Sequence, residues 1–222
     1  MSRVDLDQQL NILEQEVGLL AGDVESAITR AVDSLKRRDL AVSQQVVDED
    51  DYIDQKRFDI EDRCVDLIAT QQPMARDLRT IIAFLHIVVE LERMGDYAEG
   101  IAKISLLLGD APPIKPLIDI PGMAQKATKM LRDSMDSLIS RDLVKAHHVC
   151  QADDDVDQLY DQVHRELLLF MIQDPQAIQW ATYLLWVAHD LERIADRATN
   201  IAERVIFLVT GKMMVEANVS KN

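Results

Sequence analysis

Residues 34–55 read SLKRRDLAVSQQVVDEDDYIDQ, and they align without gaps with residues 137–158, which read SLISRDLVKAHHVCQADDDVDQ. A second match follows in each half of the chain, because LERMGDYAEGIA at 91–102 aligns with LERIADRATNIA at 191–202. Matches at offsets of 103 and 100 residues indicate an internal duplication, which is tested before any other feature of a sequence. The 222-residue chain is therefore predicted to consist of two copies of one structural unit, residues 1–110 and 111–222.

The unit is predicted to be a bundle of three helices. Apolar residues recur every three or four positions from Leu6 to Ala31, which is the spacing of a helix that packs on other helices. The chain has only 7 glycines and 6 prolines, about half of average usage, and this argues against a β-sandwich or barrel. A proline-rich segment at 109–122 joins the two copies. The predicted fold is all-α, with two pseudo-symmetric three-helix bundles and six helices at 4–37, 40–70, 74–108, 118–140, 143–172 and 176–210.

Charge and composition exclude several classes of protein. The formal net charge of −15 makes a nucleic-acid binder improbable, since such proteins need a basic surface. The two cysteines, Cys64 and Cys150, fall within helical patterns and are expected to be reduced thiols of a cytosolic protein. The longest apolar stretches fall short of the roughly 20 residues of a membrane span, and no signal peptide is visible. The sequence predicts a soluble, cytoplasmic protein that reaches a membrane only through partners.

Acidic residues four positions apart form the most informative pattern. Four residues along a helix bring two side chains to one face, with Cβ atoms about 5–6 Å apart, where like charges destabilise the helix by about 0.2–0.5 kcal/mol. A hard cation removes that repulsion by accepting several carboxylate oxygens. Because the pairs recur at matching places in both copies, they predict one metal site per repeat, formed by Asp50, Asp54, Glu92 and Asp96 in the first and by Asp153, Asp157, Glu192 and Asp196 in the second.

The second repeat has the richer set of potential ligands. His189 and Asn200 extend its acidic stripe, whereas the first repeat has Val89 and Gly100 at those positions. Two alternatives remain open. The acidic faces of a purely structural scaffold would simply be solvated, and a metal-dependent hydrolase would use the same carboxylates. A ferritin-like di-iron centre is disfavoured, because no Glu has a His three residues later.

The paired LERMGDYAEGIA and LERIADRATNIAE segments, together with QQPMARDLRTI at 71–81, closely resemble the PhoU family of phosphate-transport regulators, over essentially the whole chain. The resemblance implies two three-helix bundles and multinuclear metal sites on the eight acids named above. It also implies a ligand role for Asn200, whereas Gly100 departs from that motif. The cation would be iron, zinc or manganese, with magnesium possible.

The resemblance further implies a regulator that is not an enzyme. Such a protein assists the high-affinity phosphate ABC transporter and represses phosphate-starvation signalling when phosphate is plentiful. Its partners would be the transporter's ATPase and a sensor histidine kinase, and a homodimer is expected. The charged element from Arg76 to Arg79 has no counterpart in the second repeat, so it is either a partner contact or a charged first helical turn.

Overall fold

The computed structural model describes residues 3–110 and 119–212. These residues form six α-helices and no strand, which confirms the predicted fold class, and each predicted helix boundary lies within two residues of the observed one. The short 3-10 turn η1 (Pro175–Ala177) precedes the last helix. The helices are α1 (Arg3–Arg37), α2 (Leu40–Gln71), α3 (Arg76–Leu108), α4 (Asp119–Ser140), α5 (Leu143–Gln173) and α6 (Ile178–Thr210).

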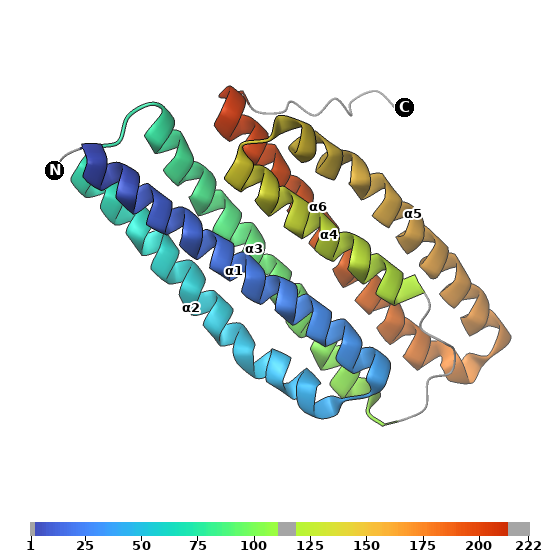
Figure 1. Cartoon of the computed structure of the whole chain (residues 1–222). Coiled ribbons are helices and arrows are strands. Elements are labelled where there is room, and N and C mark those ends of the chain that lie inside the picture. Colours follow the sequence, from blue (N-terminus) through green and yellow to red (C-terminus); the bar gives the residue numbers. More distant parts are fainter. Residues whose placement is uncertain (1–2, 111–118, 213–222) are drawn as a thin grey trace.

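The six helices run side by side as two three-helix bundles (Figure 1). Helices α1, α2 and α3 form one bundle and α4, α5 and α6 form the other, while α3 packs on α6 and α1 packs on α4 across the seam. Helices α2 and α5 therefore lie on opposite outer sides. A single hydrophobic core includes buried residues from all six helices. The predicted boundary at residue 110 adjoins residues 111–118, which lie outside the described part of the chain.

The Arg-Asp pair that recurs in the two repeats forms the same turn in both. Arg38 and Arg141 have left-handed φ angles of 60° and 56°, and the following backbone N–H donates 3.0 Å hydrogen bonds to the carbonyls of Ser34 and Ser137. The aspartate that follows caps the next helix. Asp39 accepts from the N–H of Val42, and Asp142 accepts from the N–H groups of Val144 and Lys145. Such a cap satisfies backbone donors that the helix itself leaves unpaired.

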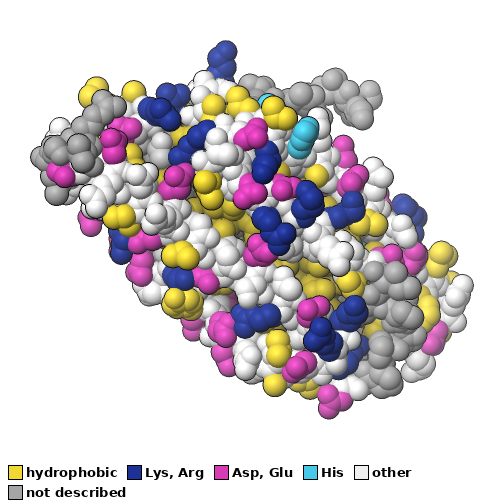
Figure 2. All heavy atoms as spheres, in the orientation of Figure 1, with side chains coloured by type: hydrophobic (Ala, Val, Ile, Leu, Met, Phe, Trp, Pro, Cys, Tyr) yellow, Lys and Arg dark blue, Asp and Glu magenta, His cyan; other side chains and the backbone are white. Residues whose placement is uncertain are grey.

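Ion pairs between α1 and the second bundle cross the seam on the face formed by α1 and α4. Figure 2 shows cationic and anionic side chains intermixed on that face. Arg132 pairs with Glu25, and Arg141 Nη2 lies 2.8 Å from Glu14 Oε1. Surface pairs of this kind contribute about 0–1 kcal/mol each, so the packing of α3 on α6 and of α1 on α4 contributes most to holding the two bundles together. Among the described residues, no helix is both long enough and apolar enough to cross a bilayer.

Candidate metal centre

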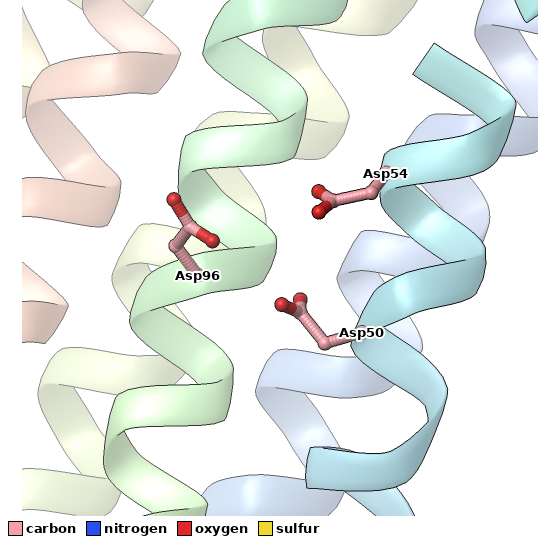
Figure 3. A group of neighbouring side chains, drawn as sticks. All are labelled: Asp50, Asp54 and Asp96. Atoms are coloured by element: carbon pink, nitrogen blue, oxygen red, sulfur yellow. The ribbon is translucent and has the colours of Figure 1, made fainter. Parts of the chain in front are cut away.

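Three carboxylates of the first repeat converge on one point. Asp50 and Asp54 project from α2, and Asp96 projects from α3 toward the same space (Figure 3). One oxygen from each lies within 4.8 Å of the others. Within the described residues, this is the one group of three or more His, Cys, Asp or Glu side chains that meets that distance. The helix pairing predicted from the repeated acid pairs is therefore present in this repeat.

A glycine on α3 allows the two helices to approach closely at this point. A Cβ atom at Gly95 would lie 3.1 Å from Ile53 Cγ2 and 3.3 Å from Asp50 Oδ1. Contacts of that length would push α2 away from α3, since Ile53 is only 4% exposed and has little room to move. The second repeat has Ala195 at the matching position. Gly95 thus helps to bring the carboxylates of α2 to those of α3.

The electrostatics of the first repeat favour a cation. Burial raises the pKa of Asp50 to about 7, and the negative charges of Glu99, Asp96 and Asp54 add to the effect. Burial, followed by the neighbouring acids, also raises the pKa of Asp96. Asp54 Oδ1 is buried and has no hydrogen-bond partner within the described structure. A buried carboxylate oxygen without a partner is destabilising unless a cation or proton reaches it.

Glu92 lies at the edge of this group, next to a cationic side chain. Arg57 on α2 places Nη1 3.9 Å from Glu92 Oε1 and Nε 3.1 Å from Glu61 Oε1. Burial is the main cause that raises the pKa of Glu92, and the charge of Asp96 adds to it, while the charge of Arg57 lowers the pKa. On the other side of the group, Lys103 Nζ lies 2.6 Å from Glu99 Oε2. The first repeat therefore has a core of three aspartates with an ion pair on either side.

The second repeat also gathers its four predicted acids, but an arginine pairs with two of them. Burial raises the pKa of Asp153 to about 7, and the charges of Asp157, Asp196 and Glu192 add to the effect. Arg193 Nε lies 2.8 Å from Glu192 Oε2, and its Nη1 lies 2.8 Å from Asp196 Oδ2. The sequence comparison favoured the second repeat as the richer ligand set, whereas the structure brings ligand oxygens into convergence in the first.

Asn200, the remaining predicted ligand, has a contact on the seam between the bundles. Its amide nitrogen donates a 3.0 Å hydrogen bond to Glu90 Oε2 on α3, and Arg197 Nη1 lies 3.1 Å from the same oxygen. Gly100 is its counterpart in the first repeat, and a Cβ there would lie 3.1 Å from Asp190 Oδ2. Burial raises the pKa of Asp190 to about 7. A metal-ligand role for Asn200 stays a prediction.

The Arg76–Arg79 element lies at the N-terminus of α3, where one of its arginines reaches the other bundle. The guanidinium of Arg79 fills the space that a Cβ of Gly211 would occupy, at the C-cap of α6. A cation near the last turn of a helix is stabilised by the carbonyl groups that point from it. Arg79 therefore has a contact within the chain, so its presence in the element can be explained without a partner protein.

Comparison with known proteins gives one consistent result. The family model described as "PhoU domain" matches the chain twice, over residues 17–105 and 120–205. A protein of Aquifex aeolicus, named "Phosphate-specific transport system accessory protein PhoU homolog", is 39% identical over 97% of this chain and 98% of its own length. A protein of the same name from Clostridium acetobutylicum is 37% identical over 96% of this chain and 98% of its own length.

Solved structures agree with the sequence matches. The crystal structure of PhoU from Pseudomonas aeruginosa superposes with a TM-score of 0.89 at 34% identity, over 93% of this chain and 99% of that one. The phosphate transport system regulatory protein PhoU from Streptococcus pneumoniae gives a TM-score of 0.88 at 30% identity, over 95% and 99% of the two chains. The duplication read from residues 34–55 and 137–158 thus coincides with the two matches to the family model.

Proposed function

Because this chain belongs to the PhoU family, we propose that it is a cytoplasmic negative regulator of phosphate uptake and of phosphate-starvation signalling. The names of its relatives support an accessory role in phosphate transport. We further propose that it acts through protein contacts with the transporter's ATPase and a sensor histidine kinase, as a homodimer. Its net charge of −15 suits an adaptor that partners recruit, since an anionic membrane surface would repel it.

The proposal includes metal binding on the paired carboxylate faces. The donor set fits a cation, because Asp54 Oδ1 and Asp153 Oδ1 are buried oxygens without a hydrogen-bond partner among the described residues. Burial and mutual repulsion also raise the pKa of Asp50 and of Asp153 to about 7, and a cation would relieve both effects. Carboxylate oxygens suit iron, manganese and magnesium, and zinc also accepts them.

The convergence of Asp50, Asp54 and Asp96 is the observation that carries this part of the proposal. A bound cation would supply positive charge at that point and connect α2 to α3. Its carboxylate ligands would then keep the two helices at a fixed separation, and its charge would lower the net negative charge of the surface that a partner meets. No proton transfer or bond cleavage is required for this role, which is why regulation is favoured over hydrolysis.

Elemental analysis of protein purified without an affinity tag or chelator tests the metal. We expect iron, zinc or manganese to copurify with the wild type and to be lost from the double variant Asp96→Asn/Asp196→Asn. The same two proteins should differ in phosphate-dependent binding to the transporter ATPase. Equal metal content in a folded double variant would contradict the assignment of these faces.

A metal-dependent hydrolase remains the competing function for the same carboxylates. It requires turnover of phosphoesters when Mn²⁺ or Mg²⁺ is added, and a loss of turnover in Glu192→Gln. We expect no turnover by either protein. If metal-dependent turnover is found and Glu192→Gln abolishes it, the acids of the second repeat serve catalysis and not regulation.

A further inference from the structure

The two carboxylate sets differ in how basic residues of their own repeat contact them. The first set is Asp50, Asp54, Glu92 and Asp96, and the second set is Asp153, Asp157, Glu192 and Asp196. In the second set, the guanidinium of Arg193 spans Glu192 and Asp196 from one side. Its Nη2 donates a 3.0 Å hydrogen bond to Glu192 Oε1, and its Nε and Nη1 each lie 2.8 Å from an oxygen of Glu192 and Asp196, respectively. Only the Nη2 contact with Glu192 is a hydrogen bond, since Arg193 Nε and Glu192 Oε2 are buried atoms without a hydrogen-bond partner, and the other two contacts are electrostatic. The guanidinium keeps its charge, so deprotonation cannot release it.

The matching arginine of the first repeat does not do this. Arg93 is exposed, and Asp96 is exposed beside it. Arg57 reaches Glu92 from α2 at 3.9 Å and pairs with Glu61, whereas Arg93 acts on Glu92 and Asp96 only through its charge. The second repeat has Tyr160 at the position that matches Arg57, and the ring centroid of Tyr160 lies 6.3 Å from that of His189. Glu192 and Asp196 are then compensated by their own helix neighbour, Arg193.

Helix spacing adds a second difference. Gly95 lets Asp50 of α2 come close to α3, whereas Ala195 occupies the matching position on α6. Three oxygens of the first set already lie within 4.8 Å of one another. A cation that enters the first set therefore finds ligands in place, and one that enters the second set must first separate Arg193 from two carboxylates.

We propose that Arg193 closes the second carboxylate set, so that divalent cations fill the two sets in order, the first at low and the second at higher concentration. This inference rests on the proposed metal binding and adds its regulation. The side chain of Arg193 is 36% exposed, so it can swing into solvent when a cation replaces it. The duplicated chain would then respond to cations over two concentration ranges, with the first set filled throughout and the second set acting as the variable one.

Titration with Mn²⁺ tests the order of filling, with free Mn²⁺ followed by its EPR signal. Wild-type protein should show a tight and a weak class of site that differ by at least about tenfold in dissociation constant, the equivalent of one strong hydrogen bond. The variant Asp54→Asn should lose the tight class, and Asp157→Asn should lose the weak one. Arg193→Gln should tighten the weak class about tenfold.

Arg93→Gln is the matched control, because it removes the same charge from the same position of the first repeat. It should leave the weak class unchanged and so separate the contact of Arg193 from a general gain in negative charge. Arg193→Lys keeps the charge without the planar fork, and its weak class should fall between those of the wild type and Arg193→Gln. Circular dichroism of each variant establishes that it is folded.

The outcomes separate this inference from the proposal beneath it. The protein could show two classes of site while Arg193→Gln and Arg93→Gln tighten the weak class equally, or do not tighten it at all. That result would overturn the role of Arg193 and leave the proposed metal binding unaffected. Equal affinity of both sets in the wild type would overturn ordered filling in the same way. Absence of Mn²⁺ binding to any of the folded proteins would overturn both.

Discussion

Gly95→Ala is the substitution that examines the close approach of α2 and α3 most directly. Replacing glycine by alanine inside a helix stabilises it by about 0.8–1 kcal/mol. Here the new methyl group would meet Ile53 Cγ2 at 3.1 Å and both Ile53 Cδ1 and Asp50 Oδ1 at 3.3 Å. Ile53 is buried and β-branched, so it cannot rotate away easily, and overpacking of a core costs about 1–3 kcal/mol. We expect the variant to be about 1 kcal/mol less stable than the wild type.

Urea denaturation in the presence of a chelator measures this change, and the chain supplies its own control. Gly22 lies exposed in α1, and a Cβ there would meet nothing within 4 Å. Gly22→Ala should therefore show the helix-propensity gain alone, about 0.8–1 kcal/mol of added stability. The difference between the two variants then isolates the steric cost at the contact between α2 and α3.

The same variant should weaken the first carboxylate set. The methyl group would displace Asp50, so the tight class of Mn²⁺ site should lose affinity in Gly95→Ala and keep it in Gly22→Ala. The reasoning is refuted if both variants gain the same stability and Gly95→Ala binds Mn²⁺ as tightly as the wild type. That result would mean that α2 and α3 adjust freely and that the spacing at Gly95 does not position the ligands.

Three further predictions concern protons and caps. Asp50, Asp153 and Asp190 have folded-state pKa values of about 7 against an ordinary 3.8, so the folded protein binds more protons than the unfolded chain between these values. Stability of the metal-free protein should then fall as pH rises from 5.5 to 8, and differential scanning calorimetry should show a Tm that is a few degrees higher at the lower pH. Asp190→Asn should be about 1 kcal/mol more stable than the wild type at pH 8. This advantage should shrink as the pH falls toward 3.8, the ordinary pKa of the unfolded side chain, and equal denaturation midpoints at pH 8 would count against a buried charge. Asp142→Ala removes the acceptor for two N–H groups of α5 and should cost about 1 kcal/mol in a urea titration, whereas Ser140→Ala, in the last turn of α4, should cost less.

The sequence predicted the fold in detail because its signals are local and repeated. The Arg-Asp pairs mark the two tight turns, and the structure shows that each aspartate caps the helix that follows. Helical spacing of apolar residues located every helix, since a long helix needs a continuous buried stripe. The start of α3 was less predictable, because Ala75 adopts φ 48° and ψ −104° without a side-chain cap and delays the helix to Arg76.

The carboxylate sets were predictable as positions but not as geometry. Spacing of four residues indicates which acids share a helix face, yet it does not show how closely two helices approach. Gly95 permits that distance in the first repeat, because a Cβ there would meet Ile53 and Asp50, which lie 42 to 45 positions earlier in the chain. Glu99 was absent from the predicted ligands although it adds to the field at Asp50, and its three-residue spacing from Asp96 was the available signal.

The sequence also did not predict which of several possible partners a charged side chain would contact. Arg93 and Arg193 occupy matching places in two similar motifs, and their surroundings differ, among other positions, where the first repeat has Arg57 and the second has Tyr160. Asn200 likewise matches a ligand position of the resembling family, while its amide hydrogen bond is made to Glu90 across the seam. These differences depend on contacts between helices, which an alignment of the two repeats does not contain.

The single core that runs through all six helices has a mechanical consequence. Ala98 and Ala102 on α3 and Ala198 and Ala202 on α6 are fully buried, and α3 packs on α6 as closely as helices pack within each bundle. The two halves are therefore rigidly joined, because neither half can rotate against the other without opening the common core. A cation bound in one repeat would therefore not be signalled to a partner by a hinge motion between the two halves. A partner would have to read it at the surface, as a local change in charge and rigidity.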